Sequence, residues 1–133
     1  MYVPTVAQTE AGFYLDIEPV RVVPISDFNK VRGAILDAID EGNPTVFTPP
    51  VDNFPKAVVL KYATVKSWAA FERDAFVWTI DQKDGKYQIK PGRRRPDRGW
   101  EDDPEKIESM PSGTTPQELA KRAAELVLLA FEN

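Results

Sequence analysis

The clearest structural signal in the chain is the helix that its C-terminal sequence predicts from Pro116 onward. Thr115 and Glu118 have the spacing of a capping box, and Pro116 takes the first helical position, where its missing N–H is not needed. The apolar residues that follow recur at helical intervals and predict one buried stripe: Leu119, Ala123, Leu126, Val127 and Ala130. A helix with such a stripe must bury that face, so the rest of the chain has to supply a surface for it.

The preceding sequence predicts short strands and one further long helix. In chain order, the expected elements are an edge or bent strand at residues 12–23, a helix at 26–41, a short strand at 45–48, a central strand at 57–62 and a short helix at 68–73. Pro19 interrupts the first strand, because proline cannot donate to a β-ladder. Ser26 or Asp27 caps the long helix, and Gly42 supplies a left-handed stop. Ser67 caps the short helix.

The best-defined strand pair is predicted at residues 75–80 and 86–90, where apolar and polar side chains alternate. The connection contains Asp84-Gly85, a dipeptide typical of tight hairpin turns. Short, mostly antiparallel strands and two longer helices predict an α+β fold. We therefore expect one domain over residues 1–133, a sandwich in which a small antiparallel-rich sheet is packed by the two longer helices.

Residues 91–113 have little apolar content and match neither a helix nor a strand pattern. They hold two groups of charged or aromatic residues: first Arg93, Arg94, Arg95 and Arg98, then Trp100, Glu101, Asp102, Asp103 and Glu105. A loop of this length inside a compact domain is usually functional or mobile. We expect this segment to be one or the other.

The chain has no histidine and no cysteine. It therefore cannot form a Ser–His–Asp triad, a Cys–His dyad, or the usual zinc, haem and iron–sulfur sites. Enzymes that work with carboxylates alone stay open, but Asp102-Asp103 lacks the spacing of a calcium loop. We expect a binding protein with no catalytic residue, no metal and no cofactor.

Net charge and hydropathy limit the classes of partner that this chain can bind. The formal net charge of −4 argues against non-specific nucleic-acid binding, which needs a basic surface. No apolar run approaches the roughly 20 residues that span a bilayer, and the N-terminus shows no signal-peptide pattern. The absence of cysteine fits a reducing compartment. We therefore expect a cytoplasmic protein that does not bind nucleic acid directly and does not cross a membrane.

Each charged group in residues 91–113 has two interpretations. Arginines 93, 94, 95 and 98 would bind a phosphate, a carboxylate or an RNA backbone, or they would pair with the carboxylates just downstream. The acidic residues would cover the basic cleft of a partner, with Trp100 as an aromatic anchor. Alternatively they form a solvated loop, with Trp100 folded onto the core.

One resemblance joins these features. The Ser67-Trp68-x-x-Phe71 turn, the hairpin VWTIDQKDGKYQIKP, the charged loop and the closing TPQELAKRAAELVLLAF helix follow one another over residues 56–131. This order resembles immunity proteins of bacterial contact-dependent growth inhibition systems, although it covers little more than half the chain.

The resemblance implies a cytoplasmic binding protein made beside a toxic effector. Such a protein binds its cognate toxin, the C-terminal domain of a large secreted effector and often a nuclease, and blocks its active or substrate-binding surface. The family has no common catalytic residue, so the expected contact residues, Trp100, Glu101, Asp102, Asp103 and Glu105, rest on charge alone. The alternative is a binding domain or enzyme that holds an anionic small molecule with the arginines. Neither interpretation favours a particular oligomeric state.

Overall fold

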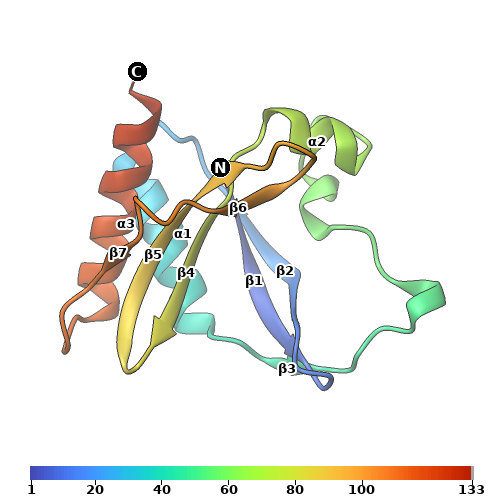
Figure 1. Cartoon of the computed structure of the whole chain (residues 1–133), viewed down its shortest axis with the longest axis horizontal. Helices are drawn as coiled ribbons and strands as arrows, with labels where there is room; N and C mark the ends of the chain where they lie inside the picture. The colour runs from blue at the N-terminus through green and yellow to red at the C-terminus, as the bar shows by residue number, and fades with distance from the viewer. Residues whose placement is uncertain (133) are drawn as a thin grey trace.

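The computed structural model describes residues 1–132, and residue 133, the last of the predicted domain, lies outside them. The fold is α+β, as predicted, but its strands form two sheets instead of one (Figure 1). The first sheet has the order β2-β1-β3, with β1 at Tyr2–Thr9, β2 at Tyr14–Val22 and β3 at Thr45–Val46. The second has β5 at its centre and consists of β4 at Trp78–Lys83, β5 at Lys86–Arg94, β6 at Trp100–Asp102 and β7 at Glu108–Ser109.

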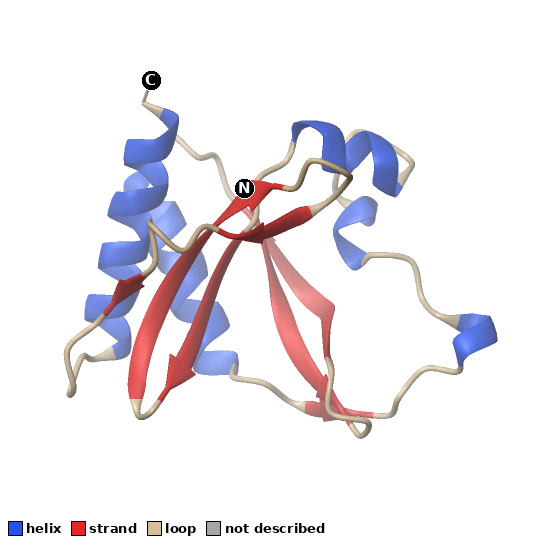
Figure 2. Cartoon of the chain, in the orientation of Figure 1, coloured by secondary structure: helices blue, strands red, loops and turns tan. Residues whose placement is uncertain are grey.

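Three α-helices accompany the sheets (Figure 2). They are α1 at Phe28–Glu41, α2 at Trp68–Asp74 and α3 at Pro116–Phe131, with short 3-10 helices η1 at Val51–Asn53 and η2 at Val58–Lys61. The two longer helices, α1 and α3, pack against each other beside β4 and β5. The main core lies between α1, α3 and β5, and its buried residues are Val31, Ile35, Ile89, Leu119, Ala120, Ala123 and Ala124.

The predicted helix ends are confirmed. The Thr115 hydroxyl accepts a hydrogen bond from the Glu118 amide, and Asp27 and Ser67 cap α1 and α2 in the same way. Gly42 ends α1 at φ 71°, in the region that favours glycine. Local side-chain chemistry therefore fixes where these helices begin and end.

The predicted stripe of α3 needs one correction. Leu119, Ala123 and Val127 are buried as expected, and Leu126 is partly buried. Ala130, however, is exposed. Ala120 and Ala124 are buried in its place. These small residues lie beside Leu119 and Ala123 and widen the buried face around the helix, within the core that α1, α3 and β5 share.

The central hairpin is confirmed, with a tighter turn than expected. Asp84 and Gly85 have φ 54° and 75°, and positive φ at both positions is the pattern of a two-residue type I′ turn. Lys83 pairs with Lys86 across this turn. β4 therefore extends to Lys83, and it begins at Trp78, opposite Pro91, instead of at residue 75.

The first sheet contains a strand that sequence patterns missed. β1 pairs with β2 along its length and is the middle strand of its sheet. Its buried face carries only Thr5, Ala7 and Thr9, whose side chains are too small or polar to produce a hydrophobic alternation. β2 is an edge strand, as predicted, and the register shifts at Pro4/Thr5 opposite the Pro19 region.

The prediction of a central strand at residues 57–62 is wrong. The segment forms the 3-10 helix η2, in which Val58 and Val59 are buried. A short apolar run reports burial, but it does not distinguish a strand from a helical turn. η2 packs against β2 and β1, where the Tyr62 hydroxyl donates to the Glu18 carboxylate at 2.7 Å.

The expectation of a 23-residue loop at residues 91–113 is also wrong. β5 continues through the arginines to Arg94, and the acidic residues return as β6, while β7 pairs with the first half of β5. β7 is tied to α3 because both Nε and Nη2 of Arg122 donate to the Glu108 carboxylate at 2.7 and 2.8 Å. This contact lowers the pKa of Glu108.

Candidate functional site

The charged segment forms a second hairpin on β5. Arg93 lies opposite Glu101, and Gly92 lies opposite Asp102, so the basic and acidic runs pair across antiparallel strands. Opposite charges at facing positions stabilise such a pair. The sequence pattern predicted a loop for both runs because neither carries the apolar alternation of a strand.

Two cations hold the acidic residues in place. Lys90 Nζ lies 2.6 Å from Asp81 Oδ2 and 3.9 Å from Asp102 Oδ2. Arg93 lies 3.3 Å from Glu101 and 4.0 Å from Asp103. Each cation is thus shared by two carboxylates, which leaves an excess of negative charge.

We call this carboxylate group the acidic row; it comprises Asp81, Glu101, Asp102, Asp103 and Glu105. Three of its members come from β4 and β6, and Asp103 also accepts a hydrogen bond from the Glu105 amide at 3.1 Å. The hydrogen bond to Asp81 raises the pKa of Lys90, because the charged ammonium group is the form that donates to the carboxylate. The second carboxylate oxygen of Asp81 is buried without a hydrogen-bond partner among residues 1–132.

Trp100 begins β6 but faces α2. Its indole N–H donates to the Ala75 carbonyl at 3.1 Å, and its ring meets the Trp68 ring edge-on at 5.9 Å between centroids. The indole is partly buried. This is the arrangement in which Trp100 folds onto the body of the protein; its role as a partner's anchor stays a prediction.

Arg94 caps the C-terminal end of α2. Its guanidinium donates to the carbonyl oxygens of Glu72, Arg73 and Ala75 at the C-terminal end of α2. Those carbonyls have no partner within the helix, and a cation there also complements the helix dipole. The same guanidinium lies 5.2 Å above the Phe76 ring. Arg94 is therefore engaged on several sides within the chain.

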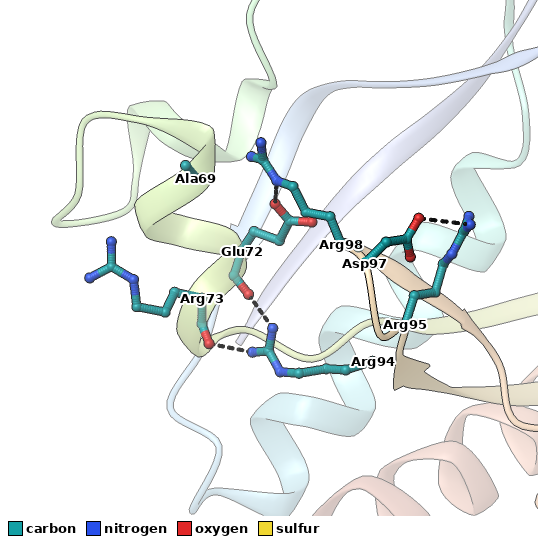
Figure 3. A pocket seen from close by; sticks show the side chains of 8 residues that line it. Ala69, Glu72, Arg73, Arg94, Arg95, Asp97 and Arg98 are labelled. Atoms are coloured by element: carbon teal, nitrogen blue, oxygen red, sulfur yellow. Dashed lines mark hydrogen bonds and ion pairs between the residues drawn. The ribbon is translucent and has the colours of Figure 1, made fainter.

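A cleft of about 370 Å³ opens beside Arg94, as Figure 3 shows. We call it the arginine cleft; its lining is Ala69, Glu72, Arg73, Arg94, Arg95, Asp97, Arg98 and Gly99. Arg98 Nε donates to Glu72 at 2.8 Å, and Arg95 pairs with Asp97 at 3.2 Å. The guanidinium groups of Arg73, Arg95 and Arg98 lie apart in Figure 3 and do not converge on one point.

The cleft changes the membership of the predicted anion site. Arg94, Arg95 and Arg98 line it, whereas Arg93 is held by the acidic row. Arg73 of α2 also lines the cleft, as does Glu72, which is buried and pairs with Arg98. Neither residue was identified from the sequence. Both residues lie 20 or more positions before the arginine run, so only the tertiary fold brings them there.

A second recess, of about 450 Å³, lies between β2 and the last turns of α1. Asp37, Asp40 and Glu41 line it together with Arg21, which lies 3.7 Å from Glu41. The recess is acidic, like the β6 edge.

The described residues contain no group of three or more side chains suited to hold a metal ion. Over residues 1–132, no helix is both long and apolar enough to cross a membrane. Comparisons with protein-family models, curated proteins and solved structures found no match for this chain.

Proposed function

We propose that this protein is a cytoplasmic immunity protein of a contact-dependent growth inhibition system. It binds the toxin domain at the C-terminus of a large secreted effector, in a stoichiometric complex, and covers the toxin's active or substrate-binding surface. The proposal assigns no catalytic role to any residue of the chain.

The observation that carries the proposal is the acidic row on β6. Four of its carboxylates pair with Lys90 or Arg93, and two of these, Glu101 and Asp102, are exposed on an edge strand. Ion pairs and β-pairing fix their positions before any partner arrives. A nuclease must bind phosphate groups, so its cleft is basic, and an ordered set of carboxylates can occupy that cleft in place of substrate.

The proposal predicts that charge on β6 controls how fast the complex forms. The variant Glu101→Lys/Asp102→Lys/Glu105→Lys should slow association with the toxin domain encoded by the neighbouring effector gene by about ten-fold or more at low salt. The loss should shrink at high salt, because exposed charges are screened within about 8–10 Å. Stopped-flow association at two ionic strengths measures both effects.

The matched control places the same charge change in the acidic recess between β2 and α1. Asp37→Lys/Asp40→Lys/Glu41→Lys should leave the association rate much closer to that of the unaltered protein. If the α1 variant is the slow one, the toxin binds near α1. If the unaltered protein does not bind the toxin domain at all, the proposed function is wrong.

The arginine cleft supports a second candidate function, the binding of an anionic small molecule. Four arginines and two carboxylates line it, which leaves a net positive charge on a protein of net charge −4. The cleft is present, but its guanidinium groups diverge, and Arg94 is already engaged with carbonyls. A ligand there would have to be extended, with anionic groups at several points.

This second function predicts saturable binding of tripolyphosphate, a linear polyanion that carries charge at several points along its length. Isothermal titration should detect heat that disappears in Arg95→Ala/Arg98→Ala and persists in Arg93→Ala, because Arg93 lies outside the cleft. Equal heats for all three proteins would remove the small-molecule function. Arg94 is unsuitable for this test because it also holds the end of α2.

A further inference from the structure

The arginine cleft keeps most of its hydrogen-bond donors free. A guanidinium group carries several N–H donors in a rigid plane. Arg98 uses its Nε for Glu72, and Arg95 uses one Nη atom for Asp97. The Arg73 side chain is exposed and forms no hydrogen bond or ion pair within residues 1–132. Three separate side chains therefore offer charged donors to an anion from outside the chain.

The turn that carries two of these arginines is held against α2. The Arg95 amide donates to the Gly99 carbonyl at 3.0 Å, which closes the connection between β5 and β6. Gly99 has φ 79°, and a Cβ atom there would lie 3.4 Å from the Glu72 carboxylate. Arg98 binds the same carboxylate, which is buried. Because the cleft is formed before any ligand arrives, binding requires little ordering of the backbone.

An exposed tryptophan borders the cleft. Trp68 is 41% exposed, although its ring packs on Phe71 and Trp100 at 5.4 and 5.9 Å between centroids. It precedes Glu72 by four residues in α2, and residues at that spacing share a helix face. Trp100, which its ring meets edge-on, directly follows Gly99 of the cleft lining. These neighbours fix the indole beside the cleft and leave part of it open to solvent.

These two features together fit a single strand of nucleic acid. Phosphates repeat along such a strand, so they can reach guanidinium groups that do not converge on one point (Figure 3). Its unpaired bases can stack on an exposed aromatic ring, which a polyphosphate lacking bases cannot do. The cleft has a volume of about 370 Å³, the size of a small-ligand site, so it accommodates only a short stretch of the strand.

The positive charge is local. The chain as a whole has a net charge of −4, from which the sequence predicts no direct binding of nucleic acid. The cleft itself, however, holds four arginines against Glu72 and Asp97. This distribution disfavours the coating of a long duplex, which needs an extended basic surface, but it allows contact with a few successive phosphates.

We infer that the arginine cleft and Trp68 bind a short segment of single-stranded nucleic acid. Arg73, Arg95 and Arg98 hold its phosphates, and a base stacks on Trp68. The inference rests on the second candidate function, the binding of anions in this cleft, and extends it to a strand with bases; it does not depend on toxin binding. The cleft would then be an exception to the expectation drawn from net charge.

The test is the anisotropy of a fluorescein-labelled thymidine hexanucleotide at low salt. Arg95→Ala/Arg98→Ala should weaken binding by about ten-fold or more, because two phosphate contacts are lost. Trp68→Leu should weaken it by about ten-fold, the usual scale for the loss of a stacked base. The matched controls are Arg93→Ala, outside the cleft, and Phe47→Leu, whose ring is 84% exposed elsewhere. Both should bind as the unaltered protein does.

A second probe tests stacking without a change in the protein, because Trp68 also packs on Phe71 and its replacement can loosen α2. An abasic hexamer has the same phosphates and no bases, so it should bind the unaltered protein about ten-fold more weakly than the hexanucleotide. The hexanucleotide should also quench tryptophan fluorescence, whereas the abasic hexamer should not.

The remaining outcomes overturn the inference. If the unaltered protein does not bind the hexanucleotide but binds tripolyphosphate, the small-molecule function stands and the strand is excluded. Equal affinities for the hexanucleotide and the abasic hexamer would mean that the cleft recognises phosphate alone. An equal loss in Arg93→Ala and in Arg95→Ala/Arg98→Ala would show general attraction to the arginine run instead of binding in the cleft.

Discussion

Replacing Leu119 with alanine is expected to lower the free energy of unfolding by about 2–5 kcal/mol, the usual cost of removing a buried leucine and leaving a cavity. Leu119 has no exposed surface and lies in the first half of α3, within the core that joins α1, α3 and β5. Its neighbours are fixed by close packing and can collapse only partly into the space. Urea denaturation followed by circular dichroism measures the change, with an unaltered m-value as the check on two-state behaviour.

Two other leucines of α3 provide matched controls. Leu126 is partly buried against the same core, and Leu129 is 56% exposed. The same substitution should cost progressively less at these positions, and Leu129→Ala should change stability by less than about 0.5 kcal/mol. Equal losses at Leu119 and Leu129 would mean that α3 does not pack with the face described.

The helix ends and the tight turn are the features of the fold that can be predicted from the sequence. Thr115, Glu118 and Gly42 act through hydrogen bonds and dihedral preferences within a few residues, so the sequence reveals them directly. The Asp84-Gly85 turn is local in the same sense. Burial of Ala120 and Ala124, by contrast, depends on where α1 approaches α3, and an alanine in a helix carries no sign of that.

In the candidate site, too, contacts between residues close in the sequence can be predicted, whereas contacts between distant residues cannot. One interpretation of the arginines is that they pair with the carboxylates just downstream, and Arg93–Glu101 and Arg95–Asp97 do so. Arg94 and Arg98 instead bind α2. Glu72 and Arg73 reach the arginine cleft only because β5 and β6 pass the end of α2. Long-range placement of this kind depends on the packing of whole elements, and no local pattern records it.

Strand β6 could not be predicted from the sequence for a related reason. A three-residue strand of Trp100, Glu101 and Asp102 has no apolar alternation of its own. It exists because β5 is long enough to pair with it beyond the point where β4 begins. The acidic row therefore depends on a junction at which three strands meet.

Gly92 lies at that junction, and Gly92→Ala is expected to disturb both stability and binding. A Cβ atom at this position would lie 2.6 Å from the Val77 carbonyl oxygen, and the Gly92 amide donates to that same oxygen at 2.8 Å. The clashing atom belongs to the backbone, so no side-chain rotation relieves the contact. We expect a loss of about 1–3 kcal/mol in the free energy of unfolding, as for other overpacked sites.

The effect on binding follows from the pairing of Gly92 with Asp102. A backbone shift that accommodates the new methyl group should move β6 and separate Asp102 from Lys90 and Glu101 from Arg93. Under the proposed function, association with the toxin domain should slow as expected for the charge-reversal variant, although no charge has changed. The matched control is Gly33→Ala in α1, where a Cβ atom meets nothing within 4 Å. Alanine there should instead stabilise the protein by about 0.5–1 kcal/mol, because glycine is unfavourable inside a helix. Unchanged stability in Gly92→Ala would show that β4, β5 and β6 do not meet as closely as described, whereas lost stability with unchanged association would separate β6 from toxin recognition.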